Sequence, residues 1–269
     1  MFHVFELSAA ETPQWLPDGV GSIGRIGVLT PDFDPVPESE MWAMVPAGVS
    51  IHTARVRYQR GKPMTFADPP TVDAAVELLT HLAPRVILYG FTSSSYTVGA
   101  EADEQLRLRL EKRSQNIPVI LTCRAAIEAF RMLNVSRIAL IHPPWFSEGA
   151  NALGKNYFTA EGFQVLRCER ITPLRAIEEE VSPTALFDWV TKNVPPAAEV
   201  VFLGGNGLRA VGAIHALEES LGKPVLTANQ VLLWKALRLL EVTDKVTKYG
   251  MIFSSHPPQK ETEPTKTEN

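Results

Sequence analysis

The chain is poor in cysteine, and it lacks the features that mark membrane, secreted or metal-stabilised proteins. Only two of its 269 residues are cysteines, too few for a disulfide framework or a cysteine-based metal site. No uninterrupted apolar run approaches the ~20 residues that a membrane span requires. The start of the chain, MFHVFELSAAETPQW, also lacks the basic and apolar stretches of a secretion signal. We therefore expect a cytoplasmic protein with reduced thiols, no membrane partner and no bound metal.

An excess of positive charge is also missing. The formal net charge is −4, and charged residues make up 21% of the chain, so nothing indicates a nucleic-acid surface. Hydrophobic residues make up 45%, which is typical of a globular protein that buries its own core without staples. The expected partner is a small molecule.

Short apolar segments rich in β-branched residues alternate with helical patterns along the chain. Each apolar segment ends at a polar, Gly or Pro cluster, and this alternation is typical of βαβ units and a parallel sheet. The predicted strands are residues 25–30, 49–57, 85–90, 118–123, 137–142, 163–170, 200–204 and 224–228, and the predicted helices are residues 71–82, 101–114, 124–133, 184–193, 208–221 and 230–240.

The apolar segments repeat in the same order in two parts of the chain. Buried parallel strands resemble one another in general, but three ordered matches favour an internal duplication. We predict an α/β fold of two similar Rossmann-like or flavodoxin-like parallel-sheet halves, related by a pseudo-twofold, with an active-site cleft between them. The matches are RIGVLTP with RIALIHP, RVILYGF with EVVFLGG, and PVILTC with PVLTAN.

The first of the two predicted halves is discontinuous in the sequence. Residues 1–117 and 230–269 form the first half, with an N-terminal extension and a disordered C-terminal tail, and residues 118–229 form the second. Ligands of open parallel sheets bind beyond the carboxyl ends of the strands. The loops that follow the strands are therefore the expected walls of the cleft.

Two of these loops carry hydrogen-bond donors. Thr92 and Ser93 can hold a carboxylate or an oxyanion through hydroxyl and backbone N–H groups, and a solvated turn is the alternative. Asn206 and Gly207 are expected to open a helix whose N-terminus binds anions, although Asn206 fits a simple N-cap equally well. The other expected ligand contacts are Phe91, Ser94, Tyr96, Trp145, Gly205 and Asn229.

Four residues are candidates for catalysis. Asp34 is a general base if burial raises its pKa, or else a turn aspartate. His142 ends a strand at the cleft and titrates near neutrality, although a structural histidine is more common. Cys123 lies beside Arg124, a cation that can lower a thiol pKa, although a buried inert cysteine is more common. Ser93 is a nucleophile only if a base lies near it.

The segments RIGVLTPDFDPVPESE, YGFTSSSY, RIALIHPPW, LGGNGLRAV and PVLTANQVLLWKAL, in this order, resemble the aspartate/glutamate racemase superfamily. Within it they are similar to the maleate cis-trans isomerase and arylmalonate decarboxylase branch. The likeness covers residues 25–240. It implies two facing α/β halves, cofactor-free chemistry at the α-carbon of a small acid, and a homo-oligomer.

The sequence departs from this resemblance at the residues that carry the chemistry. The family's cysteines fall on Phe91 and Gly205, its first-loop asparagine falls on Asp34, and its tyrosine falls on Pro144. Glu38 falls on a glutamate that is common in the isomerase branch, and we interpret both Glu38 and Glu40 as helix-start carboxylates.

Three hypotheses follow. The first is a cofactor-independent isomerase, lyase or hydrolase that acts on a small carboxylate or carbonyl compound without a cysteine pair, with Asp34 or His142 moving the proton. The second is an inactive relative that binds or senses a small metabolite. The third is hydrolysis of an amide or lactone with Ser93 or Cys123 as nucleophile.

Overall fold

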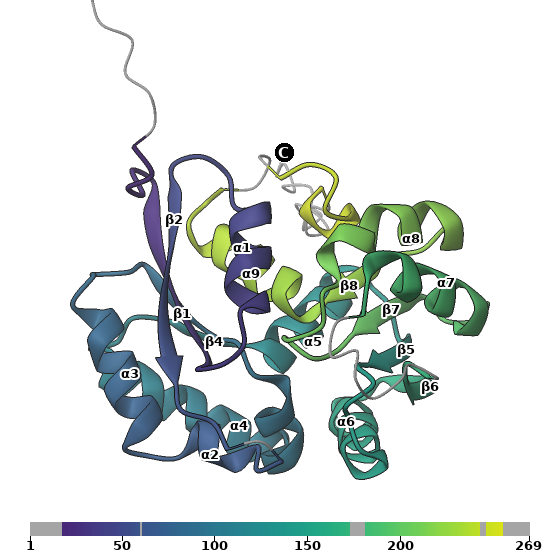
Figure 1. The fold of residues 1–269 in the computed structure, drawn as a ribbon, viewed down its shortest axis with the longest axis horizontal. Helices are drawn as coiled ribbons and strands as arrows, with labels where there is room; N and C mark the ends of the chain where they lie inside the picture. The colour runs from purple at the N-terminus through teal and green to yellow at the C-terminus, as the bar shows by residue number, and fades with distance from the viewer. Residues whose placement is uncertain (1–17, 60, 173–180, 243–245, 255–269) are drawn as a thin grey trace, which may run out of the picture.

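Two four-stranded parallel sheets form the centre of the molecule (Figure 1). The computed structural model describes residues 18–59, 61–172, 181–242 and 246–254. The first sheet has the order β2-β1-β3-β4, and the second has the order β6-β5-β7-β8. Both orders put the first strand of each half second in its sheet, so the predicted duplication and fold class are confirmed. The expected C-terminal tail, residues 256–269, and the expected N-terminal extension apart from residues 18–20 lie outside the described residues.

The strands are short, and most of them are buried because helices cover them, although the edge strand Gln164–Arg170 is only partly buried. Those of the first sheet are β1 (Gly24–Pro31), β2 (Val49–Val56), β3 (Val86–Tyr89) and β4 (Val119–Leu121). Those of the second are β5 (Arg137–His142), β6 (Gln164–Arg170), β7 (Val200–Leu203) and β8 (Val225–Thr227).

Helices connect successive strands. In the first part of the chain they are α1 (Val36–Met44), α2 (Met64–Ala67), α3 (Thr71–Thr80), α4 (Thr92–Arg113) and α5 (Thr122–Met132). In the second part they are α6 (Glu148–Ala160), α7 (Pro183–Asn193), the 3-10 turn η1 (Val211–Ala213), α8 (Ile214–Leu221), α9 (Ala228–Leu239) and the 3-10 turn η2 (Met251–Phe253).

Several sequence-based assignments are wrong. Helix α4 begins at Thr92 and not at residue 101, and α6 was not predicted. β4 pairs with β3 in the first sheet, so the division expected at 117/118 falls one strand too early. Cys123 lies in the first turn of α5, not in a strand. The helix expected to start at residue 208 begins only at Ile214, after η1. Residues 204–210 are therefore a loop, and they form no helix N-terminus.

The two halves touch through α4 and α6, where two glycines allow close packing. Tyr96 on α4 lies edge-on to His142, with 5.4 Å between ring centroids. A Cβ added at Gly154 would lie 2.8 Å from Tyr96 Cε2 and 2.9 Å from His142 Cε1. A Cβ at Gly204 would lie 2.9 Å from the Tyr96 hydroxyl. Both positions therefore require the smallest residue.

We expect the Gly154→Ala substitution to lower the free energy of unfolding by about 1–3 kcal/mol, because its methyl group overpacks the contact between the halves. Gly149→Ala is the matched control on the same helix, since its Cβ meets only Ser147 Oγ, at 3.7 Å. Urea unfolding measures both variants. Equal stability of the two would contradict the packing argument.

Candidate active site

Loops that follow strands of both sheets meet at one place. Thr92 is the first residue of α4, directly after β3, and its side chain is buried. Its backbone N–H and its hydroxyl both donate to Asn206 Oδ1, at 2.9 and 2.7 Å. Asn206 lies in the loop after β7, so this contact joins the carboxyl ends of the two sheets. The two donors converge on one oxygen atom, and we call this pair of donors the Thr92 cradle.

The Asn206 amide is fully paired. Its Nδ2 donates to Asn229 Oδ1 at 3.0 Å and to Thr122 Oγ1 at 3.2 Å. The Thr122 hydroxyl lies 3.0 Å from the carbonyl of Tyr89 and donates to it. Asn229, in the first turn of α9, donates from Nδ2 to the backbone carbonyl of Asn206 at 2.8 Å and to Glu40 Oε2 at 2.7 Å.

Glu40 ends this chain of hydrogen bonds in the first half. Its Oε1 accepts the backbone N–H groups of Ala210 and Val211, at 2.6 and 3.0 Å. Only 7% of the residue is exposed. Burial raises the pKa of the Glu40 carboxyl to about 7 against the effect of these donors, and the nearby charge of Asp34 adds to the increase. The interpretation of Glu40 as only a helix-start carboxylate is therefore wrong, because its buried carboxylate binds residues of the second half and of α9.

Asp34 lies in the loop after β1 and is half-buried. Its Oδ1 accepts the N–H of Val36 at 3.0 Å, and a Cβ at Gly207 would lie 2.7 Å from its Oδ2. Burial raises the pKa of the Asp34 carboxyl, while the Val36 N–H and Arg55 oppose the increase. Arg55 donates to the Asp34 carbonyl and pairs with Glu38, both at 2.7 Å. A carboxyl group thus faces the loop that carries Asn206.

The two positions that the resemblance assigns to cysteine have their own structural roles. The Phe91 ring packs against Tyr58 and Phe66, with centroids 4.9 and 4.6 Å apart. Gly205 has φ +110°, and a Cβ there would lie 2.8 Å from Pro143 Cγ. A side chain at Gly205 is therefore disfavoured by both the backbone and its neighbour.

His142 is fully buried and paired at both ring nitrogens. Nδ1 lies 2.8 Å from Asn151 Oδ1, and Nε2 lies 3.2 Å from the Tyr96 hydroxyl, so Nδ1 donates and Nε2 accepts. The ring also stacks on Phe146. Burial lowers the pKa of His142 to about 4. These contacts favour a neutral structural histidine, and its catalytic role stays a prediction.

The other expected site residues do not take part in the hydrogen bonds of the cradle. Ser94 pairs with the Tyr89 hydroxyl at 2.7 Å, and Tyr96 contacts His142 within the core. Cys123 is fully buried, and burial raises the pKa of its thiol. Ser93 is half-buried beside Thr92, and Trp145 is 47% exposed. The structure brings together Thr92, Gly205, Asn206, Gly207, Asn229 and Asp34.

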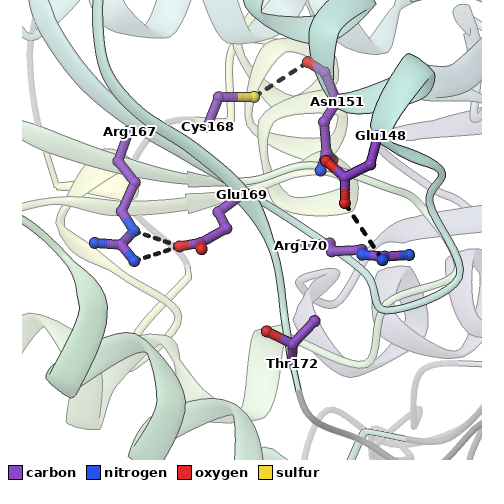
Figure 2. A pocket seen from close by; sticks show the side chains of 7 residues that line it. All are labelled: Glu148, Asn151, Arg167, Cys168, Glu169, Arg170 and Thr172. Atoms are coloured by element: carbon purple, nitrogen blue, oxygen red, sulfur yellow. Dashed lines mark hydrogen bonds and ion pairs between the residues drawn. The ribbon is translucent and has the colours of Figure 1, made fainter.

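A cavity of about 410 Å³ lies elsewhere in the second half, along β6 and the start of α6 (Figure 2). Its charges are paired, since Arg167 binds Glu169 and Arg170 binds Glu148. Cys168 donates to the Asn151 carbonyl, and burial raises the pKa of its thiol to about 11. Nothing in this lining indicates a reactive group.

The described residues contain no group of three or more histidine, cysteine or acidic residues that could hold a metal ion. Within the same residues, no helix is long and apolar enough to cross a membrane.

Sequence reasoning missed Arg55, and it expected Glu40 and Thr122 only as part of the cleft walls, without the hydrogen bonds that they form. Glu40 and Arg55 come from elements other than those that carry the donor loops, and no short motif links them. The one available signal for Thr122 was its position at the end of β4, where the cleft was expected.

The paired parallel sheets and the meeting of their carboxyl ends define a class of two-half α/β proteins. A family model described as arylmalonate decarboxylase matches residues 68–253. The chain therefore belongs to the arylmalonate decarboxylase family, a family of enzymes.

The relatives agree with this assignment. A maleate isomerase of Pseudomonas putida is 26% identical over 246 residues, covering 86% of this chain and 97% of that protein. One of Geobacillus stearothermophilus is 26% identical over 257 residues, with the same coverage. A crystal structure of a Pseudomonas putida maleate isomerase with maleate has a TM-score of 0.79, 19% identity and coverage of 87% and 98%. An arylmalonate decarboxylase structure has a TM-score of 0.72, 20% identity and coverage of 86% and 100%.

The burial of neutral His142 predicts a specific pH dependence of stability. Its pKa is about 4 in the folded chain and ~6.5 when unfolded. Between these values the unfolded chain binds more protons, so His142 destabilises the fold as pH falls through this window, by about 3 kcal/mol in all. Relative to His142→Gln, the wild type should lose this amount between about pH 7 and pH 4 in urea unfolding. The control is exposed His215→Gln, and a pH-independent difference for His142→Gln would contradict the argument.

Proposed function

We propose that the protein is a cofactor-independent isomerase or decarboxylase that acts at the α-carbon of a small carboxylate or carbonyl compound without a pair of cysteines. The observation that carries this proposal is the Thr92 cradle, in which an N–H and a hydroxyl hold one oxygen atom at 2.9 and 2.7 Å. Donors in this arrangement stabilise an oxygen on which negative charge develops. Thr92 opens the first segment of α4, which runs as far as a kink at Gly99, and the partial positive charge at this helix start adds to the effect.

A substrate oxygen takes the place of Asn206 Oδ1 in this mechanism. The carboxylate or carbonyl of the substrate accepts the two Thr92 donors as the α-carbon loses a proton or a carboxyl group. In decarboxylation, the electrons of the broken C–C bond pass into the remaining carboxyl group as CO₂ leaves. The resulting enediolate is then protonated at the α-carbon.

Asp34 is the proposed proton carrier. Its pKa is raised by burial, which makes it a better proton donor near neutrality than an exposed aspartate. In racemisation the carboxylate takes the α-proton and returns it to the α-carbon. In decarboxylation the protonated carboxyl delivers its proton to the enediolate and is protonated again by water.

The uncharged cradle and the neighbouring carboxyl also favour a small substrate with little negative charge. Arg55, whose charge acts on Asp34, is engaged, since it donates to the Asp34 carbonyl and to Glu38. A second carboxylate on the substrate must therefore face away from Asp34 or leave as CO₂. The likeness to enzymes named maleate isomerase and arylmalonate decarboxylase supports screening both chemical classes.

A second candidate function is binding or sensing of a small metabolite without turnover. It is favoured by the Asn206 amide, which already fills the Thr92 cradle, and by Gly205, whose φ of +110° disfavours any catalytic side chain there. Hydrolysis by Ser93 or Cys123 receives less support, because the Cys123 thiol is fully buried.

A thermal-shift screen with maleate, phenylmalonate and related mono- and dicarboxylates, followed by analysis of the products, tests the two functions. Turnover supports the enzyme. Stabilisation by a ligand that remains unchanged supports the binder.

For a compound that is turned over, we expect Asp34→Asn to lower kcat by about 10²-fold or more, because the amide cannot carry the proton. The Val36 N–H still has its acceptor in this variant, so the loop remains folded. The control is Asp32→Asn in the same loop, at an exposed position. Equal kcat values for Asp34→Asn and the wild type would eliminate Asp34 as the proton carrier.

Thr92→Val tests the cradle itself. The substitution keeps the size and the backbone N–H of Thr92 and removes only the hydroxyl donor, so kcat should fall by about 10²-fold. Thr97→Val on the same helix removes an exposed hydroxyl that binds the Ser93 carbonyl, and it should leave kcat within about twofold of the wild type. If both variants keep full activity, the oxyanion is stabilised elsewhere.

A further inference from the structure

The hydrogen bonds between Glu40 and Thr92 run in one direction. Starting at Glu40, each acceptor is met by an amide N–H of the next residue: Glu40 accepts from Asn229, and Asn229 accepts from Asn206. Asn206 in turn accepts from Thr92. The three links connect residues that are 189, 23 and 114 positions apart in the sequence. All four residues are buried.

The direction of this chain is fixed at both ends. The backbone N–H of Thr92 is only a donor, so it requires Asn206 Oδ1 rather than Nδ2. The backbone carbonyl of Asn206 is only an acceptor, so it requires Asn229 Nδ2. An ionised carboxylate is also only an acceptor, so Glu40 requires the same amide group of Asn229. One orientation of the Asn206 and Asn229 amide groups meets all three requirements.

The orientation of the Asn206 amide at the Thr92 cradle depends on the group that residue 40 offers at the other end of the chain. If Glu40 offered a donor, Asn229 would have to turn over its amide. Its Oδ1 would then face the Asn206 carbonyl, and its Nδ2 would face Asn206 Nδ2. Turning Asn206 as well would point Nδ2 at the Thr92 N–H. Each way of accommodating a donor at residue 40 leaves a buried polar group unpaired, which is costly.

We propose that Glu40 is a positioning residue whose acceptor-only carboxylate, acting through Asn229, holds the Asn206 amide with its Oδ1 toward the Thr92 cradle. This inference rests on the proposed function in one respect, namely that the cradle is where the substrate oxygen binds. Glu40 itself touches no substrate. It keeps the cradle paired and aligned while the site is empty, and it leaves Asn206 Nδ2 pointing away from the cradle.

Amide hydrogen exchange at Thr92, followed by NMR at pH 8, tests the proposal without any substrate. In Glu40→Gln the carboxamide offers an N–H to Asn229. Exchange at Thr92, relative to the buried amide of Val28 in β1, should become about tenfold faster than in the wild type. Asn229→Ala removes the middle link and leaves the two backbone bonds of Glu40 in place, so it should have a similar effect even if Glu40→Gln folds poorly.

Glu218→Gln is the matched control. Glu218 is also 7% exposed and its carboxylate also accepts two backbone N–H groups, from Val225 at 3.1 Å and Met251 at 2.9 Å. It lies outside the Glu40 chain. Glu218→Gln removes a buried carboxylate that is not part of this chain, so the amide hydrogen exchange at Thr92 relative to Val28 should stay unchanged.

The proposal is wrong if Glu40→Gln and Asn229→Ala both match Glu218→Gln in the relative exchange at Thr92.

Turnover adds a separate result. If a substrate is found, Glu40→Gln should lower kcat/KM by about tenfold or more, because the cradle of the empty site is then misaligned, and Glu218→Gln should change kcat/KM by less than about twofold. If the wild type turns over nothing, the proposed function fails, and the exchange data still decide the role of Glu40.

Discussion

The buried hydrogen-bond chain from Glu40 through Asn229 and Asn206 to Thr92 is the constraint on which the arrangement of the two halves depends. Its members come from α1, α9, the loop after β7 and the start of α4. A polar group buried without a partner is costly, so the chain is favourable only when all four segments are in place. This requirement sets one relative position of the two sheets, which apolar packing alone would leave less well defined.

A second polar network lies between the halves, on the side of α4 and α6. Asp103 accepts from Ser95 and Tyr157, both at 2.7 Å, while Tyr96 and His142 form the adjacent contact. Burial raises the pKa of Asp103 and lowers that of His142, so both buried groups favour their neutral forms. The interface between the halves is thus built from neutral or paired polar groups. Such contacts fix geometry at little gain in stability.

The sequence predicts the fold well because parallel strands leave a local signal. Residues 137–142 are recognised as a strand to the exact bounds, and the repeat of that segment reveals the duplication. The helix expected at residue 208 fails because Gly205 and Gly207 allow a loop that carries Asn206 across to the other half. The only sequence signal for helix α1 was its carboxylates. Pro35 and Pro37 suggest a turn instead, although proline is well tolerated in the first turn of a helix.

The candidate site is only partly encoded in local patterns. Thr92, Asn206 and Asn229 follow strands, so their gathering at one edge is predictable from topology. Their pairing is not, because a hydrogen bond between residues 114 positions apart depends on the final position of both sheets. Glu40 shows the limit most clearly. As a carboxylate on a short helix it looks like a helix-dipole partner, and only the folded chain brings it to Ala210, Val211 and Asn229.

The same geometry also bears on chemistry based on paired cysteines, because neither position 91 nor position 205 accepts a thiol without further changes. At position 205 the backbone has φ +110°, and Pro143 occupies the space that a Cβ requires. At position 91 the side chain packs against Tyr58 and Phe66. A thiol at either place would need a new backbone path or a new packing partner. The groups that do face the meeting point of the sheets are oxygen acceptors, hydroxyls and amides, and these groups are suited to holding an oxyanion and moving a proton.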